Sequence, residues 1–281
     1  MTDTSPSLLR RIVLSPSGAI GLVLILMVVA MAALAGYLFP QGPWSMVARP
    51  YLWPGRNEAA LFGTDPLGRD ILAGIFYGAR VSLLVGLVAT ACALVIGITV
   101  GSIAGYFGGA IDALLMRITD AFQTIPGFLF AIVLVGVLSP SITNIIIAIA
   151  VVSWPPIARL TRAEVLKVRA MEYVQACKLM GMSSARIILT QVLPNSLSPV
   201  IVATAVLVAI AIITEAGLSF LGLGDPNVMS WGTLINIGRP AIRTSWYISL
   251  IPSGFVVLTV LALNLLGDAI NDALNPHFRK R

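Results

Sequence analysis

Charged residues are scarce in this sequence. Asp, Glu, Lys and Arg make up 11% of the 281 residues, whereas hydrophobic residues make up 58%. A soluble domain normally carries about 25% charged residues. So few charged side chains cannot cover so apolar a chain in water, but a lipid bilayer allows apolar surface to face outward. We therefore predict an integral membrane protein.

Cysteine, histidine and nucleotide-binding motifs are also sparse. The two cysteines, Cys92 and Cys177, are too few for a disulfide framework, and we expect both to be free thiols. The one histidine, His277, lies in a charged tail, which argues against a His-rich metal site or a Ser-His-Asp arrangement. No G-x-x-x-x-G-K-[ST] sequence occurs, so the chain does not bind ATP through a phosphate-binding loop. We expect no catalytic residue, metal or cofactor here, and no nucleic-acid partner, because no basic stripe with interleaved aromatics is present.

Uncharged runs predict six membrane-spanning helices. About 20 apolar residues cross the hydrocarbon core. The first run, 18–39, exceeds the apolar region of about 7–15 residues in a signal peptide, so we read it as a retained helix. The run 121–158 is too long for one helix and is divided at Ser139-Pro140-Ser141, while Pro126 is a candidate kink in its first half. The expected spans are 18–39, 81–105, 113–138, 142–159, 197–222 and 247–270.

Basic residues favour an arrangement with both chain ends inside. Cytoplasmic segments are enriched in Lys and Arg. With the N-terminus inside, twelve of the eighteen basic residues are cytoplasmic, and the six outer ones are Arg49, Arg56, Arg69, Arg80, Arg239 and Arg243. This arrangement gives a cytoplasmic segment 1–17, a periplasmic loop 40–79 and a cytoplasmic tail 274–281.

The cytoplasmic segment 160–196, between the fourth and fifth spans, carries much of the interior charge. Tyr173, Ala176, Cys177 and Met180 are spaced as one apolar face of a short helix. Gly181 is typical of a helix end. A second short apolar stretch, residues 187–189, leads to Leu193, Pro194 and Asn195, where we expect proline to stop the helix. Two short helices at about a right angle would form a rigid projection suited to docking into a groove on another protein. A solvated connector is the alternative interpretation.

This segment resembles a known motif. The order Gln175-Ala176-Cys177, then Gly181, then Leu193-Pro194 is similar to the EAA loop of bacterial ABC-importer permeases. Glutamate is replaced by Gln175 and the second alanine by Cys177. In that family the loop docks on cytoplasmic ATPase subunits, and the resemblance implies this role for these residues.

Further motifs extend the resemblance along nearly the whole chain, to the second permease of dipeptide, oligopeptide and nickel importers. The matching segments are 63–70, 77–83, 105–109, 219–224 and 264–268. The resemblance implies a type I permease core at 80–273, with five helices and the first span packed peripherally. It also implies a bacterial inner-membrane heterodimer with a homologous permease, two ATPase subunits that bind ATP and Mg, and a periplasmic binding protein. The expected function is import of short peptides by alternating access, with nickel or another small solute as the alternative.

Two further groups of residues have structural and functional interpretations. Asp65, Arg69 and Asp70, in the outer loop, either contact the binding protein or fix the loop through internal ion pairs. Gly97, Gly101, Gly105 and Gly109 recur every fourth residue, which is typical of a smooth helix face for close packing in lipid.

Acidic residues within spans are costly and are candidates for function. Glu215 lies in the fifth span, where it either lines the translocation pathway, pairs with a polar group on a neighbouring subunit, or is protonated. Asp120 and Asp268 lie near the inner boundary. A self-contained proton-coupled transporter that uses Glu215 and Asp120 is an alternative function, although we find no convincing internal repeat of the kind such transporters carry. A non-transporting membrane scaffold is a third.

Overall fold

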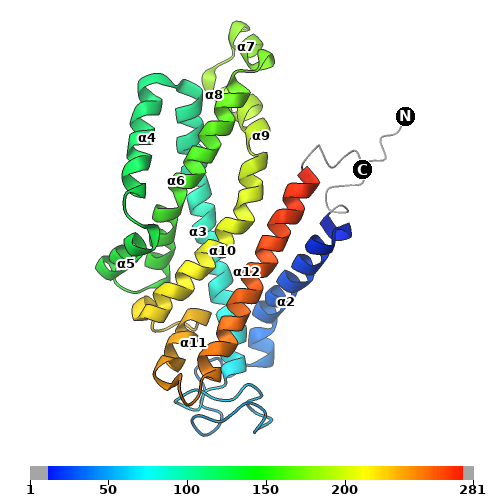
Figure 1. Cartoon of the computed structure of the whole chain (residues 1–281), viewed down its shortest axis with the longest axis vertical. Helices are drawn as coiled ribbons and strands as arrows, with labels where there is room; N and C mark the ends of the chain where they lie inside the picture. Colours follow the sequence, from blue (N-terminus) through cyan, green and yellow to red (C-terminus); the bar gives the residue numbers. More distant parts are fainter. Residues whose placement is uncertain (1–11, 275–281) are drawn as a thin grey trace.

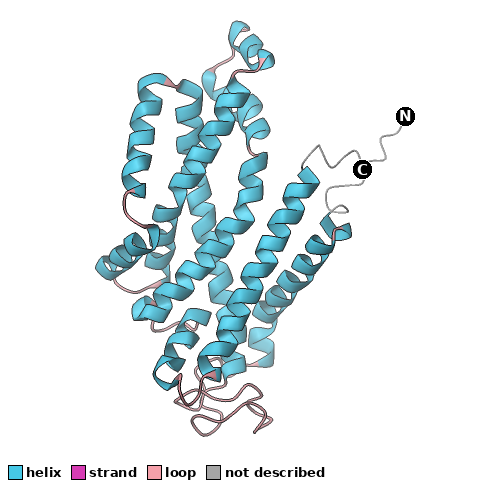
Figure 2. Ribbon diagram, in the orientation of Figure 1, coloured by secondary structure: helices cyan, strands magenta, loops and turns pink. Residues whose placement is uncertain are grey.

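The computed structural model describes residues 12–274, and these residues form helices joined by loops (Figure 2). Five helices are long and apolar enough to cross a membrane: α2 (Pro16–Leu38), α3 (Ile71–Phe107), α6 (Ile142–Arg169), α10 (Ser198–Leu218) and α12 (Tyr247–Leu274). Helices α4 (Gly109–Gln123) and α5 (Gly127–Leu138) make a sixth span only if they are counted together, because they are bent by 81° at a short break. The predicted all-α membrane fold is confirmed. The third predicted span is a broken one.

The helices extend beyond the uncharged runs that predicted them. Helix α3 begins at Ile71, well before the predicted start at residue 81, and α6 continues to Arg169, inside the predicted loop 160–196. Hydropathy marks only the part of a helix that lies in lipid. The backbone stays helical farther because its ends are capped: the Asp70 carboxylate accepts hydrogen bonds from the backbone N–H groups of Leu72 and Ala73.

The helices form an elongated bundle with two distinct ends (Figure 1). One end carries α7 (Glu172–Leu179) and α8 (Ser184–Ile187), and the opposite end carries α11 (Trp231–Gly238) and the loop of residues 39–70. Helix α2 lies at the edge of the bundle, where it packs against α3 and α12. This position agrees with the peripheral first span implied by the sequence resemblance.

Helices α3 and α6 make the most extensive helix–helix contact, and glycine allows it. A Cβ atom on Gly97 would lie 2.6 Å from the Ile157 Cβ, and one on Gly101 would overlap the Ala158 carbonyl oxygen. Gly105 faces Val165 in the same way. These three residues confirm the predicted packing face. Gly109 does not belong to it, because it follows the end of α3, has a φ of +56° and has no neighbour within 4 Å of a built Cβ.

Helix α4 is attached to α6 by two ion pairs. The Arg162 guanidinium bonds both carboxylate oxygens of Asp112, and an Arg159 nitrogen lies 2.5 Å from an Asp120 oxygen. Thr119 is the one fully buried residue of α4, so apolar packing contributes little to its position. The ion pairs therefore add to a limited apolar contact, in which the Phe122 ring packs on Trp154.

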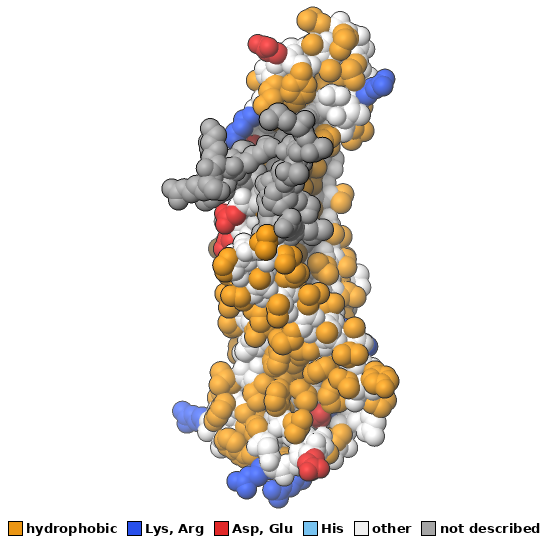
Figure 3. Space-filling view, turned by 90° about the vertical axis from the view of Figure 1, so that its right-hand side faces the viewer, with side chains coloured by type: hydrophobic (Ala, Val, Ile, Leu, Met, Phe, Trp, Pro, Cys, Tyr) orange, Lys and Arg blue, Asp and Glu red, His pale blue; other side chains and the backbone are white. Residues whose placement is uncertain are grey.

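The surface is arranged as a membrane protein requires. On the face seen in Figure 3, hydrophobic side chains cover the middle of the molecule, and Lys and Arg side chains gather at both ends. A broad apolar band between two charged rims can be buried in a bilayer while the rims stay in water.

Candidate functional site

Residues 170–183, between α6 and α8, form a projection at one end of the bundle, which we call the α7 projection (Figure 1). Its helix ends where the sequence predicted. Gly181 has a φ of +77°, its N–H bonds the Lys178 carbonyl, and the Met182 N–H bonds the Cys177 carbonyl at 3.2 Å. This pair of hydrogen bonds is the Schellman pattern, in which glycine supplies the left-handed residue.

One face of α7 packs on the bundle and the other is open. Val174 and Cys177 are buried in a cluster that includes Tyr106, Val165 and Ile187. The open face is mainly apolar: Met171 (48%), Tyr173 (39%), Leu179 (90%) and Met180 (72%) are exposed there beside Ala176, together with the acidic side chain of Glu172. Cys177 thus departs from the predicted apolar face, because it points into the bundle, whereas Tyr173, Ala176 and Met180 lie outside.

Gln175 makes a hydrogen bond that a glutamate, the usual residue of the EAA loop at this position, could not make. Its amide Nε2 donates to the Arg169 carbonyl at the end of α6, at 2.7 Å. An ionised carboxylate only accepts hydrogen bonds. The side chain is otherwise exposed, so Gln175 both fixes α7 to α6 and lies beside the open apolar face.

Pro194 does not stop a helix, and that prediction is wrong. The chain stays helical from α8 through the π-turn η1 (Ile188–Val192) to the end of α9 (Leu193–Ser196), and is interrupted only at Leu197, before α10. Pro194 occupies the first turn of α9, where proline's missing N–H is tolerated. Leu193 is half-buried and Pro194 is exposed. The expected second helix of the segment 160–196 thus runs through Pro194 and ends at Ser196, one residue before the fifth span begins at Ser198.

Glu215 lies at a junction of four elements near the opposite end. Its side chain is 2% exposed on α10. Ser82 of α3 donates a hydrogen bond to it at 3.1 Å, and Ser219 of the π-turn η2 (Ser219–Leu223) donates one at 2.7 Å. The Ser82 hydroxyl also faces the backbone N–H of Trp231 in α11, at 3.5 Å. The carboxylate thus connects α10 with α3 and η2, and the Ser82 hydroxyl extends the contact to α11.

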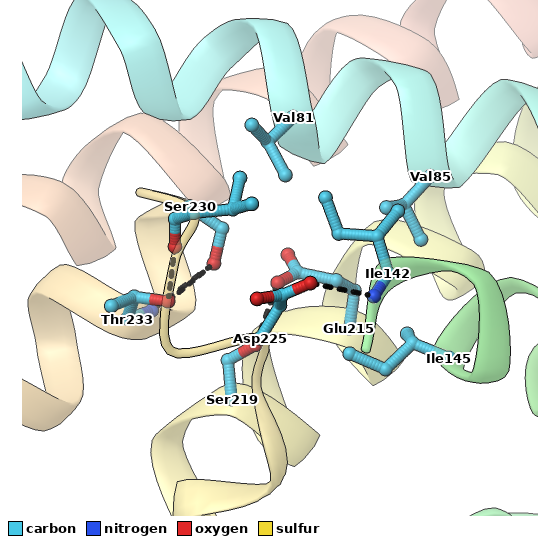
Figure 4. A pocket seen from close by; sticks show the side chains of 10 residues that line it. Val81, Val85, Ile142, Ile145, Glu215, Ser219, Asp225, Ser230 and Thr233 are labelled. Carbon is cyan, nitrogen blue, oxygen red and sulfur yellow. Dashed lines mark hydrogen bonds between the residues drawn. The ribbon is translucent and has the colours of Figure 1, made fainter. Parts of the chain in front are cut away.

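Asp225 shares a small cavity with Glu215 (Figure 4). The Asp225 carboxylate accepts hydrogen bonds from the backbone N–H groups of Ile142, at the start of α6, and Asn227. The cavity measures about 10 Å³, room for one water molecule. No peptide fits there, and Glu215 therefore binds its own helices in this conformation. Its interpretation as a pathway residue stays a prediction.

The other two acids within predicted spans lie on open surface. Asp120 pairs with Arg159, and Asp268 is exposed on α12. The sequence analysis missed the Asp112–Arg162 pair. The available signal was opposite charges on two consecutive spans, acids on α4 and arginines on α6.

The two aspartates of the 39–70 loop are turned inward, whereas Glu58 is exposed. Asp65, 1% exposed, accepts hydrogen bonds from the backbone N–H groups of Leu67 and Arg69 and pairs with the Arg69 guanidinium at 2.5 Å. Asp70, 6% exposed, caps α3. Burial raises the pKa of Asp70, and the two backbone hydrogen bonds partly offset that effect. Buried carboxylates are not available to another protein, so internal bonding of the loop describes Asp65 and Asp70 better than contact with a binding protein.

A distant tyrosine, missed in the sequence analysis, anchors this loop. The Tyr247 hydroxyl, at the start of α12, donates to the Leu52 carbonyl at 2.9 Å and also contacts the Thr64 carbonyl. The Thr64 hydroxyl in turn donates to the Arg49 carbonyl. The side chains left exposed on the loop include Met46, Tyr51, Trp53, Leu61 and Leu67.

Residues 12–274 contain no group of three or more His, Cys, Asp or Glu side chains placed to hold a metal ion. Cys92 is exposed and Cys177 buried, and both are free, as predicted. His277 lies outside the described residues.

Comparisons with known proteins give one consistent result. Residues 97–280 match the model of the family described as binding-protein-dependent transport system inner membrane component. The chain is 43% identical over 226 residues to the dipeptide transport system permease protein DppC of Alkalihalophilus pseudofirmus, covering 80% of this chain and 74% of that one. It is 38% identical to the di/tripeptide transport system permease protein DppC of Pseudomonas aeruginosa, covering 92% and 88%. Among solved structures, an inward-facing form of the MetNI methionine ABC transporter matches with a TM-score of 0.59 at 17% identity, over 72% of this chain and 97% of that one.

Proposed function

This chain belongs to the family of binding-protein-dependent transport system inner membrane components, and we propose that it is the permease through which an ATP-driven importer moves short peptides. Permeases of this family are non-catalytic, multi-pass subunits of the inner membrane. The peptide substrate is inferred from relatives that are 38–43% identical over most of the chain and are named for dipeptide and tripeptide transport.

The α7 projection is the observation that supports coupling to ATPase subunits. Leu179 and Met180 are 90% and 72% exposed on a rigid, glycine-terminated helix whose other face is packed on the bundle. Covering apolar side chains such as these with a partner protein lowers the free energy, because their surface is removed from water. We propose that the importer has two ATPase subunits, which bind ATP and Mg, and that one of them docks on this projection through the exposed residues Gln175, Ala176, Leu179 and Met180.

The remaining partners follow from the same architecture. A homologous permease completes the heterodimer, and a periplasmic binding protein delivers the peptide to the end of the bundle that carries α11 and the 39–70 loop. In this arrangement, the N- and C-termini and the α7 projection are cytoplasmic. ATP binding brings the two ATPases together, the α7 projections move with them, and the bundle opens outward.

A pair of glycine variants tests the coupling. Gly181 and Gly42 both have a positive φ, +77° and +78°, and neither has an atom within 4 Å of a built Cβ. Valine at either position adds the same backbone strain, on the order of 1–2 kcal/mol, but at opposite ends of the molecule. We expect Gly181→Val to abolish uptake of a radiolabelled dipeptide at normal membrane levels, while Gly42→Val retains it. Equal uptake by the two variants would remove the α7 projection from the mechanism.

Co-purification tests the assembly and the substrate. The tagged chain, extracted in mild detergent from its native host, is expected to bring a second permease and two P-loop ATPases, identified by mass spectrometry. Ligand retained on a co-purified binding protein names the solute. A chain that is recovered alone and transports after reconstitution without ATP would contradict the proposal and favour a self-contained transporter.

A further inference from the structure

The break between α4 and α5 leaves backbone groups open. Gln123 ends α4 and Gly127 begins α5, and all residues from Gln123 to Gly127 are exposed. Two hydrogen bonds flank the break, from the Thr124 N–H to the Ala121 carbonyl and from the Phe130 N–H to the Pro126 carbonyl. Within the described part of the chain, the Ile125 N–H and the Thr124 and Ile125 carbonyls take part in no backbone hydrogen bond.

This break lies deep in the membrane. A Cβ built on Gly127 lies 3.9 Å from the Val152 Cβ, and the Phe122 ring packs on Trp154 with centroids 5.3 Å apart. Val152 is about 15 Å along α6 from its start at Ile142, at 1.5 Å per residue. The hydrocarbon core is about 30 Å thick. The open backbone therefore lies near the middle of the bilayer.

Lipid cannot be the neighbour of these groups. Open backbone N–H and carbonyl groups are tolerated at this depth only where protein covers them or where they line a water-filled cavity. No other part of the chain covers them, since the residues of the break are exposed in the structure. Either water or a partner subunit must therefore satisfy the open groups.

The two exposed flanks of α4 differ in chemistry. Ile111, Leu114 and Ile118 form one flank, at spacings of three and four residues, and are 45%, 61% and 43% exposed. Asp120, Gln123 and Thr124, also at i, i+3 and i+4, form another flank that is polar and exposed. The apolar flank suits lipid, and the polar flank ends at the break.

The charged pair on the polar side distinguishes water from a protein contact. The Asp120 and Arg159 side chains form an ion pair and yet remain 62% and 48% exposed. The cores of protein interfaces are depleted of charge, whereas charged residues within membrane spans face a water-filled cavity or the bundle interior. An open ion pair beside an open backbone therefore indicates water.

We propose that the polar flank of α4 (Asp120, Gln123 and Thr124), the open backbone at the break and Arg159 line the aqueous path by which the solute crosses the membrane. This inference rests on the proposed function and deepens it. The free carbonyls offer hydrogen-bond acceptors, near the bilayer centre, to the amide and ammonium groups of a short peptide, and the polar side chains keep the path wet.

Cysteine accessibility tests the proposal. The parent chain carries Cys92→Ala and Cys177→Ala, and single cysteines are introduced as Gln123→Cys and Thr124→Cys on the polar flank, with Leu114→Cys and Ile118→Cys as matched controls on the apolar flank. The complete importer is placed in lipid nanodiscs, where both membrane faces meet a charged methanethiosulfonate reagent. A thiol reacts as its thiolate, which forms in water and is suppressed in apolar surroundings.

We expect the two polar-flank cysteines to react at least tenfold faster than the two controls, and their modification to block uptake. Equally slow reaction of all four would overturn the proposal. Fast reaction in the isolated chain that disappears in the complete importer would also overturn it, since a partner subunit would then cover the flank. Dipeptide uptake by the unmodified importer is measured separately. Its absence, with the labelling difference intact, would count against the peptide substrate and not against the path.

Discussion

The two ends of this molecule are held in shape in different ways. In the 39–70 loop, Asp65 is buried and bonded to the loop's own backbone, Asp70 is buried and caps α3, and Tyr247 fixes the loop from α12. On the α7 projection, the largest exposed side chains are apolar, with Leu179 90% exposed and Met180 72%. Both ends leave apolar side chains exposed, Met46 and Leu61 on the loop among them; the difference is that long-range hydrogen bonds fix the loop, whereas the projection is a single short helix packed on the bundle by one face.

This difference shows how the two ends can be used. A loop held by internal hydrogen bonds keeps one shape whether or not a partner is present, so it can serve as a preformed platform for a binding protein that comes and goes. An exposed apolar helix face is costly in water and favours a partner that stays. Under the proposed function, we therefore expect a transient contact at the loop and a lasting one at the projection.

Removing the buried carboxylate of Asp65 should have the largest effect on stability. Asp65→Ala leaves the Arg69 guanidinium, whose side chain is 11% exposed, without its partner and frees two backbone N–H groups. Breaking a buried pair by removing one member costs about 3 kcal/mol or more. Local opening of the loop should then rise roughly a hundredfold, measured as the rate of tryptic cleavage at exposed Arg56.

The control for this variant lies at the other end of the molecule. Lys167→Ala breaks an ion pair with Glu164 in which the lysine is 67% exposed. Exposed pairs contribute about 0–1 kcal/mol, so Lys167→Ala should leave tryptic cleavage of the 39–70 loop and thermal stability nearly unchanged. If Asp65→Ala were equally silent, the 39–70 loop would not depend on its internal bonds.

Replacing an exposed leucine at each end should sharpen the comparison. Leu179→Asp removes apolar surface from the projection, and Leu61→Asp does the same on the 39–70 loop, where Leu61 is 56% exposed. Neither variant should change the stability of the chain by more than about 0.5 kcal/mol. We expect Leu179→Asp to weaken retention of the ATPase subunits at least tenfold, about 1.4 kcal/mol, measured by pull-down at varied ATPase concentration, and Leu61→Asp to leave it unchanged. The reverse pattern would place the ATPases at the other end.

The sequence could predict the features that depend on composition and local geometry. Uncharged runs located the spans because a bilayer selects for them. Spacing identified the packing of Gly97, Gly101 and Gly105 on α6, and Gly181 ended α7 because only a left-handed residue completes that cap. Pro126 marked the break in the third span, although its angle of 81° depends on how α4 and α5 each pack.

Features that depend on distant partners could not be predicted. Tyr247 contacts the Thr64 carbonyl across 183 residues of sequence, and nothing near Asp65 indicates that the loop folds over it. Apolar residues at helical spacing around α7 form two stripes. One contains Val174 and Cys177, and the other contains Tyr173 and Met180. Which stripe packs inward is decided by the neighbouring cluster and not by the helix itself.

The smallest expected effect concerns Gln175. Loss of its single hydrogen bond should loosen the α7 end of the molecule and leave the 39–70 loop unchanged. Gln175→Ala and Gln175→Glu both remove the donor to the Arg169 carbonyl, a loss of about 0.5–1 kcal/mol at an exposed site. The backbone amides of α7 should then exchange hydrogen a few-fold faster, measured by mass spectrometry on the isolated chain. Exchange in the 39–70 loop should not change.

The two variants should differ only when the ATPases are present. Gln175→Glu restores the acid of the EAA pattern, so a basic contact on the ATPase would compensate for the lost hydrogen bond and return uptake toward normal. Gln175→Ala offers no such contact. Equal uptake by the two variants would mean that Gln175 acts through α6 alone, by holding α7 in place, whereas better uptake by Gln175→Glu would mean that position 175 touches the ATPase directly.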